Sequence, residues 1–164
     1  MAVNLDFKEL LESLNAYQVR YLLAGAHAVM HYVEPRYTKD IDIWVEPTSA
    51  NAQRTWEALG SFGAPLEGVT VEDLANPDLV YQMGVAPNRI DIMMGVPGVK
   101  WETAWRNRLQ TRYGGICINV MSREDLMRAK RTAGRPQDLL DLAALQQSAA
   151  TTSKKRTRHS KKAK

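Results

Sequence analysis

Residues 40–45 constrain the fold more than any other part of the chain. In this segment Ile41 and Ile43 alternate with Asp40 and Asp42. A period of two is typical of a β-strand with one buried face, so the isoleucines are predicted to face a core and the aspartates to share the opposite face. The Cα atoms of the two aspartates should then lie about 6.5–7 Å apart. Because like charges at that spacing repel each other, we expect a positive group between them.

Strand and helix patterns alternate along the rest of the chain. Further strands are predicted at 19–24, 79–84, 89–94 and 116–121. Helices are predicted at 7–14, 26–32, 49–59, 99–109, 123–133 and 136–146. A hairpin around Pro87 adds an antiparallel pair of strands. The pattern predicts an α/β (α+β) fold, in which a small mixed β-sheet is flanked by helices and further helices follow at the C-terminus.

Charge is distributed unevenly along the chain. The formal net charge is +4, but seven of the 22 lysines and arginines lie in residues 154–164. Residues 1–153 therefore hold 15 basic and 18 acidic side chains. With 45% hydrophobic residues overall, residues 1–150 are predicted to form one domain. Residues 151–164 are predicted to be a basic, disordered tail that either contacts RNA phosphates or only improves solubility.

Cysteine usage and hydropathy indicate a cytoplasmic protein. Cys117 is the single cysteine, so an internal disulfide is not expected, and with three histidines no Cys/His zinc set can be assembled. Apolar runs fall far short of the roughly 20 residues that cross a bilayer, and the first residues lack a signal-peptide pattern. We therefore expect a reducing, intracellular environment and no membrane association.

A third aspartate has the same pattern as the first two. Asp91 lies between two isoleucines, so a neighbouring strand could bring it beside Asp40 and Asp42. Three carboxylates can hold two Mg²⁺ ions, an arrangement that serves phosphoryl or nucleotidyl transfer. The alternative is a solvated strand face, because Asp-x-Asp pairs are common. Gly25 ends a predicted strand just before a helix, and the first N–H groups of a helix can bind phosphate.

Three segments together resemble the nucleotidyltransferase fold of the DNA polymerase β superfamily. They are Leu22-Leu-Ala-Gly25-Ala-His-Ala-Val29, Pro35-Arg-Tyr-Thr-Lys-Asp40-Ile-Asp42-Ile43 and Arg89-Ile-Asp91. Within that superfamily the chain is most similar to small bacterial AbiEii-type toxin nucleotidyltransferases, over residues 18–145. The resemblance implies that Asp40, Asp42 and Asp91 are catalytic and bind the metal ions.

Further residues are candidates for nucleotide binding. By the resemblance, Lys130 contacts the nucleotide phosphates and Asp138 orders that lysine. Read without the family, Asp138 lies in the first turn of a helix, where it complements the helix dipole, and Lys130 suits a solvated surface. The remaining candidates lie in the glycine turn and in the loop before the first aspartate, where they could reach a triphosphate. They are Gly25, Ala26, Arg36, Thr38 and Lys39.

The expected activity is transfer of a nucleoside monophosphate from a nucleoside triphosphate, such as ATP, to an acceptor hydroxyl. A tRNA end or other RNA, a protein and a small molecule all suit this chemistry, and the basic tail favours RNA. A cognate antitoxin or an acceptor protein is a further expected partner. The alternative is a catalytically silent binding module or antitoxin-like partner. It is supported by Ala26, because the family usually has glycine or serine at that position.

Overall fold

The computed structural model describes the backbone of residues 3–162 and the side chains of residues 3–156. The strands of this part of the chain form one mixed sheet and are β1 (Tyr21–Ala24), β2 (Asp40–Val45), β3 (Val80–Met83), β4 (Arg89–Met93), β5 (Leu109–Tyr113) and β6 (Ile116–Val120). The helices are α1 (Leu5–Ala16), α2 (Gly25–Val29), α3 (Ser49–Phe62), α4 (Trp101–Asn107), α5 (Arg123–Ala133) and α6 (Pro136–Lys162), with a short 3-10 turn, η1 (Asp73–Ala75). The predicted α/β fold is confirmed.

The sheet has the order β3-β4-β2-β1-β6-β5. Strand β2 pairs in parallel with β4, and β1 pairs in parallel with β6. The other neighbours, β1 with β2, β3 with β4 and β5 with β6, are antiparallel. The predicted hairpin around Pro87 is the β3–β4 pair. Strands β1 and β2 are therefore central, with a partner strand on each side.

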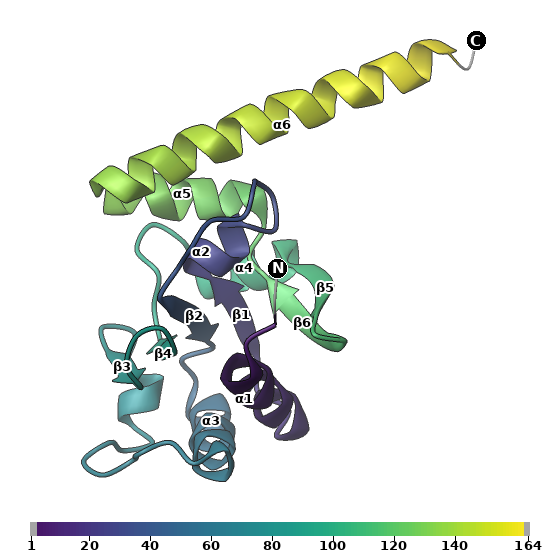
Figure 1. Cartoon of the computed structure of the whole chain (residues 1–164). Coiled ribbons are helices and arrows are strands. Elements are labelled where there is room, and N and C mark those ends of the chain that lie inside the picture. Colours follow the sequence, from purple (N-terminus) through teal and green to yellow (C-terminus); the bar gives the residue numbers. More distant parts are fainter. Residues whose placement is uncertain (1–2, 163–164) are drawn as a thin grey trace.

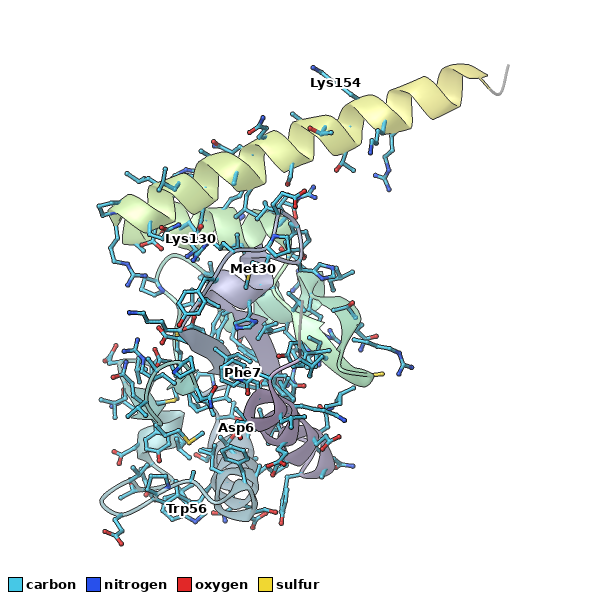
Figure 2. The ribbon with its side chains drawn as sticks, in the orientation of Figure 1. Asp6, Phe7, Met30, Trp56, Lys130 and Lys154 are labelled. Atoms are coloured by element: carbon cyan, nitrogen blue, oxygen red, sulfur yellow. The ribbon has the colours of Figure 1, made fainter. Side chains whose placement is uncertain are left out.

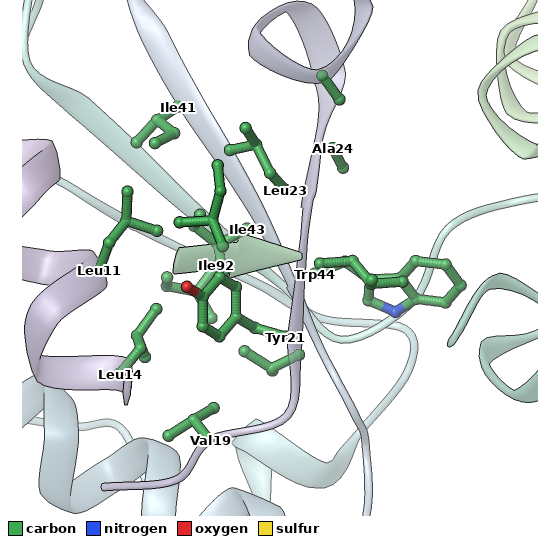
Figure 3. Close-up of a cluster of buried hydrophobic side chains, with 14 of the residues drawn as sticks. Leu11, Leu14, Val19, Tyr21, Leu23, Ala24, Ile41, Ile43, Trp44 and Ile92 are labelled. Carbon is green, nitrogen blue, oxygen red and sulfur yellow. The ribbon is translucent and has the colours of Figure 1, made fainter. Parts of the chain in front are cut away.

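Helices α1 and α3 lie together against one side of the sheet (Figure 1). Leu11 of α1 is fully buried and lies on the same side as Ile41 and Ile43 of β2 (Figure 3). Burying a side chain of this size contributes about 1.5–3 kcal/mol, which fixes the orientation of β2. Asp40 and Asp42 alternate with these isoleucines and so project from the opposite face, as the period of two predicted.

Helices α2, α5 and α6 lie at the other end of the sheet. Figure 1 shows α2 between the sheet and α5, with α6 running across α5. The hydroxyl of Ser122 accepts a hydrogen bond from the backbone N–H of Asp125 and so caps the start of α5. Gly134, with φ 64°, ends this helix, and Pro136 begins α6. Residues of the α5–α6 turn line the same cavity as the face that carries the aspartates.

Strand β5 is a correction to the sequence prediction, which placed residues 99–109 in a helix and no strand between this helix and the strand at 116–121. In the structure α4 ends at Asn107, and Leu109–Tyr113 pairs with β6. The physical reason is the turn at Gly114 and Gly115, whose φ angles of 55° and 86° suit a two-residue hairpin. Because Leu109–Tyr113 pairs with β6 across this tight turn, it adopts the extended form of a strand.

The end of α6 also differs from the prediction. The helix was expected to end near residue 146 and a disordered tail to begin at 151, whereas α6 continues to Lys162. Its sequence after Pro136 contains no glycine or proline, so no residue in it interrupts a helix. The distal half extends beyond the rest of the molecule, where Lys154 projects from it (Figures 1 and 2). Residues 163–164 of the predicted tail lie outside the described residues.

Within residues 3–162, none of the helices combines the length and the apolar character that crossing a membrane requires. Helix α6 is the longest of them, and its outer part carries the cluster of lysines and arginines.

Candidate active site

The parallel pairing of β2 with β4 brings the three aspartates together. In this register Asp40 lies opposite Arg89, and Asp42 lies opposite Asp91. All four side chains project from one face, because residues two apart in a strand point the same way. Neighbouring strands lie about 4.8 Å apart, so Asp42 and Asp91 are direct neighbours across the ladder. Strand β4 is therefore the neighbouring strand that was predicted to bring Asp91 beside Asp40 and Asp42.

Gly25 allows the backbone to pass directly against Asp42. Its φ of +57° lies in the left-handed region that favours glycine. A Cβ atom on Gly25 would lie 1.9 Å from Oδ2 of Asp42, far inside any tolerable contact. Glycine is therefore required at position 25 for two reasons. It allows the left-handed turn after β1, and it leaves space for the Asp42 side chain. The five-residue helix α2 consequently begins beside a carboxylate.

Burial and the neighbouring negative charges raise the pKa values of Asp42 and Asp91. Burial, together with the negative charges of Asp91 and Asp40, raises the pKa of Asp42 to about 6. Burial also raises the pKa of Asp91, although the nearby Arg89 guanidinium acts in the opposite direction. Lys130 and Arg89 likewise act to lower the pKa of Asp42. The face therefore carries more negative charge than its own positive neighbours offset.

Arg89 forms the ion pairs of this face. Its Nη2 donates to Oδ2 of Asp40 at 2.8 Å, and its Nε lies 3.5 Å from Oδ1 of Asp91. Gln82 of β3 donates a longer hydrogen bond, of 3.4 Å, to Oδ2 of Asp91. The buried Oδ1 atoms of Asp40 and Asp91 have no hydrogen-bond partner among the described residues. Two acceptor atoms are thus left for another donor or for a cation.

The chemistry of this donor set fits a divalent cation. Carboxylate oxygens are the ligands that Mg²⁺ and Mn²⁺ prefer, and a bound cation would satisfy the two unpaired oxygens. In the side-chain positions described for residues 3–156, however, no group of three Asp, Glu, His or Cys residues is arranged to hold a metal ion. Arg89 bridges Asp40 and Asp91 instead. A cation shared by Asp40 and Asp91 would therefore have to take the place of this guanidinium.

A second charged cluster joins α5, α6 and the loop before β2. Nζ of Lys130 lies 3.0 Å from both Asp138 and Asp141, and its side chain is only 12% exposed. Arg135 pairs with Asp138 at 2.6 Å, and Arg36 pairs with Asp141 at 3.1 Å. Burial alone would raise the pKa of Asp138, but its hydrogen bonds from Arg135 and Lys130 hold it below the usual value. With three cations and two carboxylates, this wall has a net positive charge.

An open cavity of about 620 Å³ lies between the carboxylate face and this positive wall. Lys39 is exposed and does not line the cavity. Its backbone carbonyl instead accepts a hydrogen bond from the N–H of Arg89. The candidate residues that do line the cavity are Gly25, Ala26, Arg36, Thr38, Asp40, Asp42, Asp91, Lys130 and Asp138.

Comparison with known proteins supports the fold. No protein-family model and no curated protein matches the chain. Among solved structures, the chain is similar to the crystal structure of an antigenic nucleotidyltransferase-like protein from Paracoccidioides brasiliensis, with 17% sequence identity and a TM-score of 0.51. The match covers 96% of this chain and 90% of that chain. The chain has a nucleotidyltransferase-like fold. The finer resemblance to AbiEii-type toxins stays a prediction.

Two side chains at the carboxylate face of this nucleotidyltransferase-like fold were not identified from the sequence. Arg89 stands two residues before Asp91, so the same period of two that placed Asp91 also placed Arg89 on its face. The signal for Arg89 was therefore present in the sequence. Gln82 reaches Asp91 through the register of the β3–β4 hairpin, and this register could not be derived from the local pattern alone.

The close approach at Gly25 can be tested by substitution. Gly25→Ala is expected to destabilise the protein clearly more than Gly68→Ala. Both glycines have positive φ, 57° and 75°, so each alanine carries left-handed backbone strain of about 1–2 kcal/mol. A Cβ at Gly68 meets nothing within 4 Å, whereas a Cβ at Gly25 overlaps Asp42. Urea unfolding of both variants measures the difference, and equal losses would contradict this packing.

The raised pKa of Asp42 predicts a pH-dependent effect on stability. Its folded-state pKa of about 6 exceeds the ordinary value of 3.8, so the native state binds the proton more tightly than the unfolded state. The contribution of Asp42 to the free energy of unfolding of the wild-type protein therefore falls as the pH rises from 3.8 through about 6. Asp42→Asn cannot ionise and should avoid a loss on the order of 3 kcal/mol at pH 8.

Chemical unfolding at pH 4 and pH 8 measures this gain for Asp42→Asn. The exposed Asp78 provides a matched control, because Asp78→Asn removes the same charge away from the carboxylate face. The gain from Asp42→Asn should be large at pH 8 and small at pH 4, and Asp78→Asn should show no such change. A gain that is the same at both pH values would contradict the raised pKa.

Proposed function

We propose that the protein is a metal-dependent nucleotidyltransferase, which transfers a nucleoside monophosphate from a nucleoside triphosphate to an acceptor hydroxyl. The observation that carries this proposal is the alignment of Asp40, Asp42 and Asp91 on one face, opposite a positive wall across an open cavity. Crowded carboxylates with raised pKa values reduce stability, and such groups are typical of functional sites. The nucleotidyltransferase-like fold is consistent with this chemistry.

The proposed reaction forms one phosphorus–oxygen bond and breaks another. The acceptor oxygen attacks the α-phosphorus, and the bond from this phosphorus to the bridging oxygen of the β-phosphate breaks. Pyrophosphate leaves with that electron pair. The hydroxyl proton passes to Asp91, whose burial raises its pKa and makes it a better base. Positioning and charge neutralisation supply most of the rate enhancement.

Asp40, Asp42 and Asp91 are the residues that would hold Mg²⁺, with two ions expected from the resemblance. When bound, the ions neutralise charge on the phosphates and activate the acceptor hydroxyl. The unpaired Oδ1 atoms of Asp40 and Asp91 support this assignment. Because the pKa of Asp42 is about 6, its carboxylate is mostly ionised at neutral pH and available to a cation.

We place the nucleotide phosphates between the turn at Gly25 and Ala26 and the ammonium group of Lys130. The residues on both sides line the same cavity. Asp138 holds Lys130 in a fixed position, so the lysine loses little freedom when it meets a phosphate. Three further candidates belong to the loop before β2. Arg36 and Thr38 line the cavity, and the exposed Lys39 would contact the phosphates from outside it.

We propose RNA, such as a tRNA end, as the acceptor. The distal part of α6 exposes Lys154, Lys155 and Arg156, and its sequence continues with further basic residues. A helix holds these charges along one rod that extends past the body of the molecule, which suits contact with a phosphate backbone (Figure 1). A cognate antitoxin or acceptor protein is the other partner that the toxin-like resemblance implies.

The second candidate function is a catalytically silent binding module. Two observations favour it. Arg89 already pairs with Asp40 and Asp91, and Ala26 stands where the family usually has glycine or serine. A silent module would bind neither Mg²⁺ nor nucleoside triphosphate at the cavity, so calorimetry with both ligands separates the two functions.

The activity is tested by labelling. Wild-type protein, Mg²⁺ and each α-labelled nucleoside triphosphate are incubated with total cell extract, and the labelled macromolecule is identified. Asp42→Asn is expected to reduce transfer at least about a hundredfold, because loss of even an outer partner of a metal site costs 10–100-fold. Asp78→Asn should label as wild type does. Undiminished labelling by Asp42→Asn would refute the assigned site.

A further inference from the structure

Arg89 occupies a specific position in the carboxylate face. It begins β4, it lies in register with Asp40 on β2, and its side chain shares a face with Asp91 two residues later. One guanidinium therefore contacts carboxylates of two strands, Asp40 at 2.8 Å and Asp91 at 3.5 Å. The parallel pairing of β2 and β4 places Arg89 between Asp40 and Asp91, so the position of this bridge is set by the register of the sheet.

The bridge satisfies its partners incompletely. Nε of Arg89 and the Oδ1 atoms of Asp40 and Asp91 are buried, and all three lack a hydrogen bond within the described residues. At 3.5 Å, Nε attracts Oδ1 of Asp91 by charge alone. Arg89 also carries one positive charge, whereas the face carries three carboxylates, two of which it contacts. This face therefore has spare acceptor atoms and spare negative charge while Arg89 is in place.

Arg89 is also free enough to leave. Its side chain is 41% exposed, in contrast to the 12% of Lys130 in the neighbouring cluster. Because the Arg89 side chain is partly reached by water, solvent can replace part of the interactions that it loses when it leaves. Arg89 lines the cavity of about 620 Å³, and the guanidinium can turn into that space. Lys130, with two buried aspartate partners, has no comparable freedom.

We propose that Arg89 is an exchangeable counter-ion, which bridges Asp40 and Asp91 in the cation-free protein and is displaced when a divalent cation binds. This inference rests on the proposed function, because it takes the same carboxylates to be the cation ligands. It explains why the donor set suits a metal although its side chains are not arranged around one. In the cation-free state Arg89 reduces the repulsion within the face and keeps Asp40 and Asp91 close.

A measurable consequence is that Arg89 weakens cation binding. The cation competes with the guanidinium for Asp40 and Asp91, so the observed affinity is the intrinsic affinity reduced by the fraction of molecules in which Arg89 has left. Arg89→Met keeps a long side chain and removes the charge. It should bind Mn²⁺ about tenfold more tightly than wild type if Arg89 bridges the carboxylates in about nine molecules of ten.

The titration compares four proteins with Mn²⁺ alone, by calorimetry at pH 8, where proton competition at Asp42 is small. Arg89→Lys retains the charge and should stay near wild type. Arg112→Met is the matched control, because Arg112 is exposed on β5 and donates to a carbonyl of its own hairpin. Equal or weaker binding by Arg89→Met than by wild type would overturn the inference while leaving the metal site standing. If no protein binds Mn²⁺, the proposed function and the inference both fail.

A second measurement uses the unmodified protein and so does not depend on the folding of a variant. The Nε–H signal of Arg89 is followed by ¹H–¹⁵N NMR during titration with Mg²⁺. Displacement predicts that this signal shifts over the same range of Mg²⁺ concentration in which calorimetry of the wild-type protein with Mg²⁺ shows the site filling. A signal that stays unchanged while the site fills would show that Arg89 remains on the carboxylates, and the inference would be wrong.

Discussion

The parallel pairing of β2 with β4 is the constraint on which the rest of the site depends. It sets Asp42 beside Asp91 and Asp40 beside Arg89, so that acidic groups from two strands meet on one face. The opposite face of the same strands is filled by Ile41 and other buried residues, which prevents β2 from turning over. Hydrophobic burial thus stabilises an arrangement that electrostatic repulsion alone would disfavour.

The neighbouring elements are adapted to this crowded face. Gly25 gives room to Asp42, and Arg89 supplies a positive charge between the two strands. Across the cavity, Lys130 is held by two buried aspartates of α6 rather than left in solvent. The result is a negative wall facing a positive wall across a space open to ligands. A triphosphate with bound cations carries both signs of charge and complements both walls.

Local sequence patterns were sufficient for some parts of the structure and not for others. The period of two in residues 40–45 predicted the strand and its two faces, because burial selects alternate positions. Strand β5 was not predicted, since its extended form depends on pairing with β6 across the turn at Gly114. The basic composition after residue 150 suggested disorder, yet α6 continues to Lys162, and no glycine or proline interrupts it. The Arg89 bridge depends on strand register, which arises only from the assembled sheet.

The most direct test of the account is where a cation binds. Crystals of the wild-type protein grown with Mn²⁺ and a non-hydrolysable nucleoside triphosphate would locate the ion by its anomalous scattering. The account predicts an anomalous peak among the carboxylates of Asp40, Asp42 and Asp91, with the analogue's phosphates on the side of Lys130. A bound analogue without a peak at these carboxylates, or a peak held by other residues, would contradict it.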